Sequence, residues 1–323
     1  KNGLVFSQED LNYLRHPFLY YWINASVNSF FNSHEVNNSS VYFIRHLNIF
    51  FVILNLIVCW LICKKLSINN LMKLIVFTSL LTMPMYNFLA GTVNNDNLVL
   101  VGVNLFFYGI LIYINNILNN SKNLIFSLIL ISTGLTITAL TKATGVVLIV
   151  GLTSPLIYLL RNNLNTYNIR ITCYCLAFPL FVLLLYYGNQ YYYYESFFPS
   201  PRESYPFNPP SDPLSIYDFT KIFFEKLILR SHGILAHQSF PYFNNGEFIK
   251  TIFLFILFSP IILAIFCLIF LKNTKDELAK ILLKCGFSSF LFFISIHLYV
   301  VYNKYLITGI QGGIQPRYYY IFF

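Results

Sequence analysis

Asp96 is the side chain of this sequence with the strongest claim to chemistry. It lies in the polar stretch 91–98, between apolar runs at 71–90 and 98–118, and no other charged residue lies nearby in the sequence. A carboxylate at the end of a membrane span is costly to place and is therefore a functional candidate. We expect Asp96 to face a cavity on the non-cytoplasmic side, as a base, as a group that orients an acceptor, or as a cation ligand. The alternative is an ordinary polar turn in which Asp96 only caps the next helix.

Lys142 and Arg317 are the basic residues that we expect on the same side of the membrane as Asp96. Together they could hold a phosphate or pyrophosphate, because arginine offers a planar fork and lysine a point charge. A base beside a bound phosphate would support catalysis by proton removal with charge stabilisation. The alternative for each basic residue is a side chain that extends to the lipid headgroups and does no chemistry.

The composition places these residues in a membrane protein. Of the 323 residues, 57% are hydrophobic and 10% are charged, whereas soluble domains carry roughly 25% charged residues. Apolar runs of about 18 residues or more recur along the chain, which is the signal of transmembrane helices. The net charge of +9 does not indicate nucleic-acid binding, because the basic residues are scattered between apolar runs. It fits basic cytoplasmic loops and anionic membrane lipids. The sequence therefore predicts an all-α polytopic membrane protein.

The apolar runs and the charges between them predict the topology. The run 124–160 would be about 55 Å long as one helix, longer than the roughly 30 Å membrane core, so we expect two spans that break at 141–145. The short loops with most of the Lys and Arg residues should be cytoplasmic, which puts Asp96, Lys142 and Arg317 on the other side. The expected spans are 47–63, 71–90, 98–118, two within 124–160, 171–187, 251–271, 281–302 and a ninth that begins at Tyr318.

An external juxtamembrane segment is expected at residues 1–46. Within it, Trp22 with Tyr20 and Tyr21 is typical of a short helix that lies at the membrane interface. The whole chain is expected to form a single transmembrane domain, 1–323. We also expect it to be a fragment, because it starts without Met and ends within an apolar run.

A large extracytoplasmic loop is expected at residues 188–250, the one long polar segment of the sequence. Its part 214–229 has the apolar spacing of a helix. That helix could lie on the membrane surface, or it could be a solvated helix of a small external subdomain. The cysteines lie in or near apolar runs without metal-type spacing, so we interpret them as small hydrophobic residues.

Five motifs together resemble the GT-C superfamily of membrane glycosyltransferases, in the branch of the protein O-mannosyltransferases and aminoarabinose transferases. They follow one another in the order of that family and cover most of the chain. The resemblance implies a GT-C-like helical bundle with an extracytoplasmic loop and surface-lying amphipathic helices. The motifs are HPFLYYWI at 16–23, RHLN at 45–48, VNNDNL at 93–98, LTKATGVVL at 140–148 and QPRYYYIFF at 315–323.

The resemblance also implies roles for residues within the motifs. Asp96 would be the second external acid, and Lys142 and Arg317 would lie near the phosphate of the donor lipid. The further substrate-binding residues would be His16, Asn95 and Gln315. The principal acid of the family lies well before the first motif, so it would precede Lys1, with Glu9 or Asp10 as a substitute.

Three classes of function follow as expectations. The first is a glycosyltransferase that moves a sugar from a polyprenyl- or dolichyl-phosphate donor to an acceptor on the non-cytoplasmic face. The second is a polytopic transporter or lipid flippase, and the third is a non-catalytic membrane scaffold of the same fold. The expected partners are the lipid-linked sugar donor and membrane lipids, with no nucleic acid. A divalent cation is the only cofactor considered, and no metal-binding residues are proposed. The expected location is the bacterial inner membrane or the endoplasmic reticulum membrane.

Overall fold

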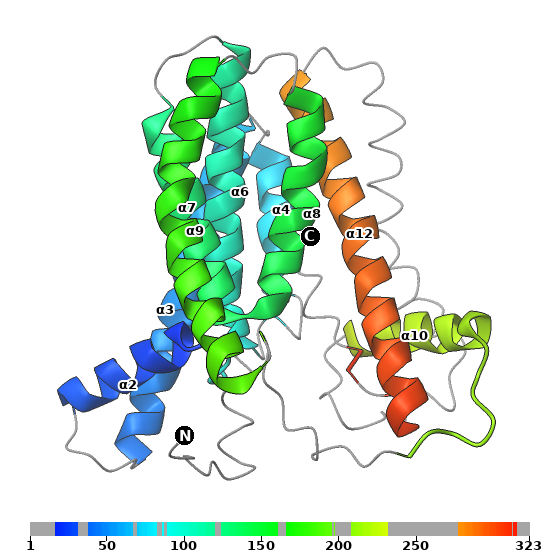
Figure 1. Ribbon diagram of the computed structural model, residues 1–323. Helices are drawn as coiled ribbons and strands as arrows, with labels where there is room; N and C mark the ends of the chain where they lie inside the picture. The colour runs from blue at the N-terminus through cyan, green and yellow to red at the C-terminus, as the bar shows by residue number, and fades with distance from the viewer. Residues whose placement is uncertain are drawn as a thin grey trace. The chain divides into compact units, whose positions relative to one another are not determined.

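Every regular element in the described part of the chain is an α-helix (Figure 1). The structure is a computed structural model that describes residues 17–31, 38–66, 70–82, 86, 89–119, 124–160, 166–195, 197, 208–231, 277–311 and 313–314. The helices are α2 (Leu19–Phe31), α3 (Asn38–Lys65), α4 (Asn70–Thr82), α6 (Asp96–Leu118), α7 (Ile125–Thr141), α8 (Ala143–Leu160), α9 (Thr166–Tyr194), α10 (Ile216–Ser231) and α12 (Glu277–Thr308).

Four of these helices are long and apolar enough to cross a membrane, as expected for an all-α polytopic membrane protein. They contain the segments Val41–Lys65, Asp96–Leu118, Tyr167–Tyr194 and Lys284–Thr308. The long run 124–160 divides into the shorter apolar helices α7 and α8, as predicted from its length. The spans expected at 251–271 and from Tyr318 lie outside the described residues.

Helices α3, α9 and α12 extend beyond the predicted spans. α9 continues to Tyr194, so the first residues of the segment predicted as a loop at 188–250 are helical. The helix predicted at 214–229 is confirmed as α10, while its place on a membrane surface stays a prediction. The helix predicted near Trp22 is confirmed as α2 and reaches Phe31.

Contacts divide the chain into two compact units. The first comprises residues 1–68, 90–150 and 157–205, and the second comprises residues 69–89, 151–156 and 206–323. Each unit is described here by itself. The candidate site belongs to the first unit.

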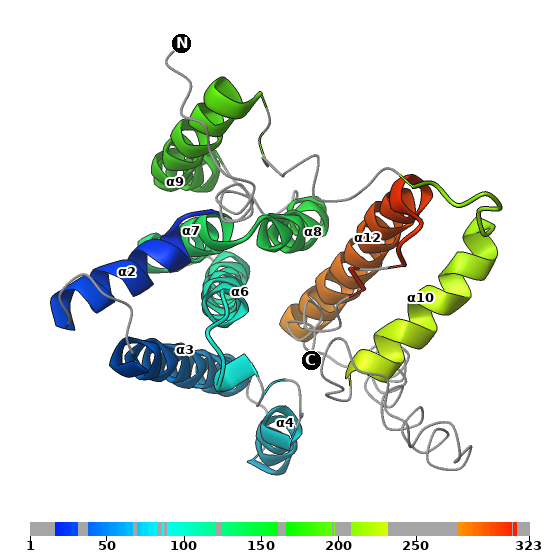
Figure 2. The ribbon, with the colours of Figure 1, turned by 90° about the horizontal axis from the view of Figure 1, so that it is seen from below.

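Polar pairs fix the directions of the helices in the first unit. Asn48 of α3 pairs with Asn97 of α6, and Asn55 of α3 pairs with Asn104 of α6. Residue numbers increase in the same direction in both helices, so the two helices are parallel. Figure 2 shows α6 between α3 and α7. The side chains of Tyr187 and Ser132 join α9 to α7 through the carbonyls of Ala139 and Cys175, and this pairing is also parallel.

Small residues bring α6 and α7 into close contact. Gly102 of α6 lies opposite Thr138 of α7, and Gly109 lies opposite Ile131, so these two helices are antiparallel. A Cβ atom added at Gly134 would lie 2.4 Å from the backbone nitrogen of Phe106 and 2.6 Å from the carbonyl oxygen of Gly102. Glycine at 134 therefore allows the two backbones to approach, as in many membrane helix pairs. This contact brings the start of α6 and the end of α7 together.

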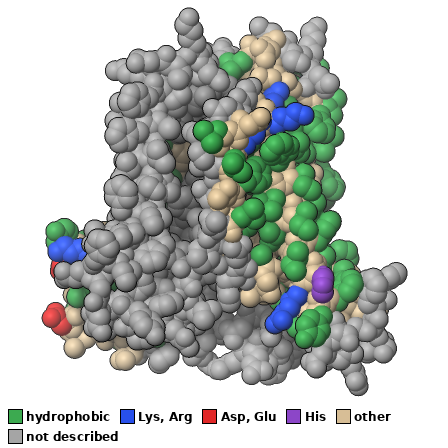
Figure 3. Space-filling model, turned by 180° about the vertical axis from the view of Figure 1, so that it is seen from behind, with side chains coloured by type: hydrophobic (Ala, Val, Ile, Leu, Met, Phe, Trp, Pro, Cys, Tyr) green, Lys and Arg blue, Asp and Glu red, His purple; other side chains and the backbone are tan. Residues whose placement is uncertain are grey.

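The outer face of α3 is apolar along most of its length. Its large exposed side chains include Ile49, Ile53, Ile57 and Trp60, which recur at helical spacing. Figure 3 shows a continuous band of hydrophobic side chains with basic side chains near both ends. Such a band suits contact with lipid tails, with the charged groups at the headgroups.

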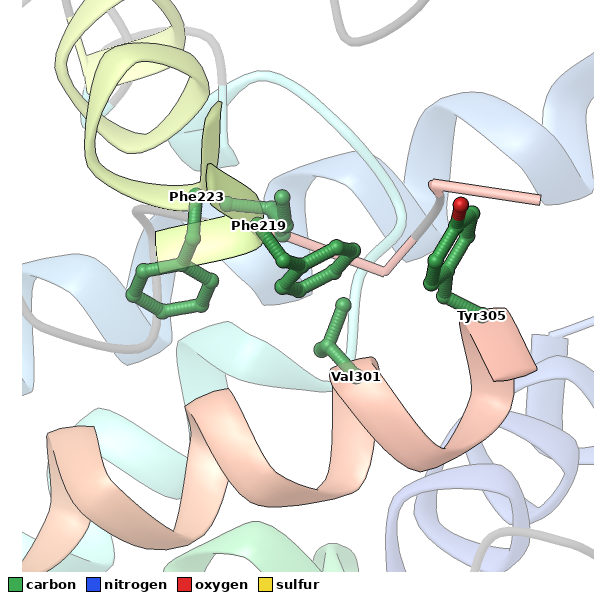
Figure 4. Packing of buried hydrophobic residues seen from close by; sticks show 5 residues of the cluster. Phe219, Phe223, Val301 and Tyr305 are labelled. Carbon is green, nitrogen blue, oxygen red and sulfur yellow. The ribbon is translucent and has the colours of Figure 1, made fainter. Parts of the chain in front are cut away.

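The second unit has its own apolar core between α10 and α12. Figure 4 shows Phe219 and Phe223 of α10 against Val301 and Tyr305 of α12. The ring centroids of Phe219 and Tyr305 are 5.1 Å apart in a stacked arrangement. Ile314, beyond the end of α12, is part of the same buried cluster. The core therefore holds the chain that leads toward the predicted motif at 315–323.

Candidate functional site

Asp96 and Lys142, which the sequence places 46 residues apart, form a buried ion pair. The Nζ atom of Lys142 donates to Oδ1 of Asp96, and the two side chains are only 6% and 8% exposed, respectively. This contact brings together two of the residues that we expected on one side of the membrane. The alternative that Lys142 extends to the lipid headgroups is wrong, because its side chain is buried against the carboxylate.

The break at Lys142 results from its backbone conformation. Lys142 is extended, with φ −160° and ψ 133°, and it follows the last residue of α7. Its N–H donates to the carbonyl of Thr138 at 3.0 Å, and its carbonyl accepts from the N–H of Gly145 at 3.0 Å. Lys142 therefore stands between the last residue of α7 and the first residue of α8. Because its backbone is extended and not helical, its side chain can reach Asp96.

Asp96 is the first residue of α6, and its neighbours supply the local turn. The side-chain oxygen of Asn94 accepts from the N–H of Asp96 at 2.9 Å. Asn95 occupies the N-cap position and makes no side-chain capping hydrogen bond. The side chain of Asn94 thus stabilises the local turn, while the carboxylate of Asp96 binds Lys142. Asn95, predicted as a substrate-binding residue, is buried beside it.

The helix ends favour both charges of the pair. An acidic group is stabilised at a helix N-terminus and a basic group at a C-terminus, because the peptide dipoles align along the axis. Asp96 stands at the N-terminus of α6 and Lys142 at the C-terminus of α7. The two helix ends and the ion pair therefore offset part of the cost of burying two charged groups.

A second set of polar groups surrounds Asn48 on α3. Its Oδ1 atom accepts from Tyr20 Oη at 3.0 Å, from the N–H of Asn94 at 3.3 Å and from Asn97 Nδ2 at 3.0 Å. Its Nδ2 atom donates to the carbonyl of Ile44 at 2.8 Å. The residues that flank Asp96 on both sides are therefore tied to α2 and α3 through one amide group.

Tyr20, expected with Trp22 and Tyr21 at the membrane interface, is buried within the protein. It is 2% exposed, whereas Trp22 is 60% exposed. The difference arises because Tyr20 packs in a cluster with Phe51, Leu98 and Val101. Burial raises the pKa of the Tyr20 phenol to about 12, so the group stays neutral and donates its proton to Asn48.

Several predicted site residues lie outside the described residues, namely Glu9, Asp10, His16, Gln315 and Arg317. The second unit does show how the chain before Gln315 is held. Lys226 of α10 donates to the Oε1 atom of Gln311 at 2.8 Å, and His297 of α12 lies 3.0 Å from the carbonyl of Gly313. These contacts were not predicted from the sequence.

Within the described ranges, no group of three His, Cys, Asp or Glu side chains could hold a metal ion. Comparison with known proteins also gives no guide, since no family model, curated protein or solved structure matches the chain. The resemblance of its motifs to the GT-C superfamily is therefore a hypothesis. The geometry of the polar cluster is the evidence that bears on the site.

Proposed function

We propose that this chain is a membrane glycosyltransferase, which moves a sugar from a polyprenyl- or dolichyl-phosphate donor to an acceptor on the non-cytoplasmic face. One observation carries the proposal. Four segments whose motifs resemble the GT-C superfamily meet in one polar cluster, through Tyr20, Asn48, Asp96 with its neighbours, and Lys142. The cluster joins positions up to 122 residues apart (20 to 142), which supports a shared role for these motifs.

The chemistry assigns different tasks to the two charged residues. The phosphate of a bound donor would attract Lys142, whose point charge suits a phosphate oxygen. The carboxylate of Asp96, released from part of this contact, would orient the acceptor and take the proton of its hydroxyl group. In the transfer, the bond between the sugar carbon and the phosphate oxygen breaks, a bond to the acceptor oxygen forms, and the lipid phosphate leaves.

The distribution of charge supports a site on the non-cytoplasmic side. Asp96 and Lys142 lie at the end of the first unit where α3 and α6 begin and where α7 ends. That end carries Arg45 of α3, whereas the opposite end carries three basic residues, Lys64 and Lys65 at the end of α3 and Arg170 near the start of α9. Basic residues favour the cytoplasmic side, so the polar cluster would lie on the other side of the membrane.

The position of the ion pair also favours an enzyme over a transporter. Transporters place their ionisable groups and broken helices near the middle of the membrane. Asp96 and Lys142 lie instead at the ends of apolar helices. A flippase or transporter is the outcome if vesicles that contain the protein move lipid or solute without sugar transfer.

The test is donor consumption by the full-length protein in liposomes, with a short-chain polyprenyl-phosphate sugar as donor and envelope extract as the source of acceptors. The decisive variant is the double substitution Asp96→Asn with Lys142→Gln, which removes both charges together and leaves neither buried alone. Asp218→Asn is the matched control, because Asp218 is an exposed acid of α10 beside Lys221.

We expect transfer by the wild type and by Asp218→Asn, and loss of transfer in a double variant that unfolds at a temperature similar to the wild type. A folded double variant that transfers sugar at the wild-type rate would remove this pair from the reaction. Failure of the wild type to consume any donor would argue against the glycosyltransferase itself.

A further inference from the structure

The amide orientation of Asn48 is fixed by its neighbours. The backbone N–H of Asn94 can only donate, so the atom that faces it must be the Asn48 oxygen. The carbonyl of Ile44 can only accept, so the atom that faces it must be the amide nitrogen. Asn48 is fully buried, with 0% exposure. Both the oxygen and the nitrogen of the Asn48 amide therefore make hydrogen bonds. A side chain at this position must offer an acceptor and a donor together.

Asn48 contacts residues that both precede and follow Asp96 in the sequence. Before Asp96, Asn48 holds the N–H of Asn94, and the side chain of Asn94 accepts from the N–H of Asp96. After Asp96, Asn48 accepts from the side chain of Asn97. The third donor, Tyr20, ties the same oxygen to α2. The turn that presents the carboxylate is thus held at residues on either side of it.

We propose that Asn48 is a positioning residue for Asp96, which keeps segment 92–97 in the conformation that presents the carboxylate to Lys142 and to the acceptor. This inference rests on the proposed function for the identity of the acceptor. Asn48 itself has no direct role in the transfer, since it contacts the turn and not Lys142. Its removal should therefore disturb the placement of the acid more than the binding of the donor.

Asn55 offers a matched control on the same helix. It is also a buried asparagine of α3, and its Oδ1 atom accepts from Asn104 Nδ2 of α6 at 2.6 Å. It lies seven positions after Asn48 (48 to 55), and its partner Asn104 lies outside segment 92–97. Asn48→Leu and Asn55→Leu each remove one asparagine pair between α3 and α6, and Asn48→Leu also removes the bonds to Asn94 and Tyr20.

The experiment compares the two variants in the full-length protein in liposomes by amide hydrogen exchange and by steady-state kinetics. We expect Asn48→Leu to speed exchange in segment 92–97 by at least about tenfold, because a buried hydrogen bond that held the turn is lost. We expect its kcat to fall by about 100-fold, because even a small displacement of the Asp96 carboxylate from the acceptor slows the reaction. KM for the donor should stay within about twofold of the wild type.

Asn55→Leu should also lower thermal stability, because it removes a buried hydrogen bond between the same two helices, yet leave exchange in segment 92–97 and kcat within about twofold of the wild type. Equal effects of the two variants on exchange and kcat would overturn the proposal, because Asn48 would then act only through general stability. Unchanged exchange in Asn48→Leu would also overturn it. If the wild type shows no transfer, the proposed function fails, and the exchange comparison alone decides whether Asn48 holds the turn.

Discussion

Asp96 and Lys142 occupy the facing ends of two antiparallel helices, and their ion pair closes the contact between α6 and α7. The glycine contact between these helices sets how closely their backbones approach, and the extended backbone at residue 142 sets where the lysine side chain starts. The pair is therefore a product of the packing as well as of charge. Four predictions follow from the structure around it, apart from the tests already described.

The first prediction concerns the stability of the ion pair. Asp96→Asn and Lys142→Gln should each lower the free energy of unfolding by about 3–5 kcal/mol, because each leaves one buried charge without its partner charge. The double variant should recover most of this loss, since no unbalanced charge remains. Thermal unfolding in detergent measures all three. Losses in the double variant that equal the sum of the two single losses would show that the residues do not interact.

The second prediction concerns the packing of α6 on α7. Gly134→Ala should destabilise the protein by about 1–3 kcal/mol or more, because the new methyl group meets backbone atoms that cannot move aside. Gly188→Ala is the control, since a Cβ atom at Gly188 of α9 would meet nothing within 4 Å. Alanine at this helical position should be neutral or stabilising by up to about 1 kcal/mol. Thermal unfolding of the two variants measures the difference. A Gly134→Ala protein with the melting temperature of the wild type would contradict the close approach of the α6 and α7 backbones.

The third prediction concerns alkaline pH. Because burial raises the pKa of Tyr20 from its ordinary value of 10.0 to about 12, the folded state holds this proton more tightly than the unfolded state. The resulting stability is fully present below about pH 10 and is lost as the pH rises toward 12. Tyr20→Phe should therefore flatten the decline of stability between these values. Parallel pH profiles for Tyr20→Phe and the wild type would show that Tyr20 titrates normally.

The fourth prediction concerns topology. In a background without cysteine, Val93→Cys and Tyr192→Cys should react with a membrane-impermeant maleimide from the same side of sealed vesicles. Val93 and Tyr192 are exposed and lie near the start of α6 and the end of α9. Asn119→Cys, at the exposed end of α6, should react from the opposite side. Reaction of all three from one side would exclude the predicted path of α6 through the membrane.

The sequence was sufficient to predict the helix break at Lys142, because one charged residue interrupts a run too long for a single span. It also indicated that Asp96 and Lys142 share one end of the bundle, since alternation of the spans puts every second turn on the same side. Their direct contact was not predictable, because it depends on the close approach of α6 and α7 at Gly134.

The roles of Tyr20 and Asn48 were missed for different physical reasons. Tyr20 was placed at the membrane interface because tyrosine is amphipathic, but tertiary packing buries its ring and a partner satisfies its hydroxyl group. Asn48 was noted only as part of a motif. A signal was present, since asparagine recurs at a seven-residue spacing in two apolar spans (48 and 55, 97 and 104), a spacing that puts both amides on one helix face.

The paired asparagines of α3 and α6 have a mechanical consequence. Two cross-links at different heights on parallel helices prevent one helix from sliding along the other, because any shift would separate both pairs at once. They also resist rotation of either helix about its own axis. The two helices should therefore move as one rigid body, and any rearrangement of this unit has to bend the chain at the junctions that flank them.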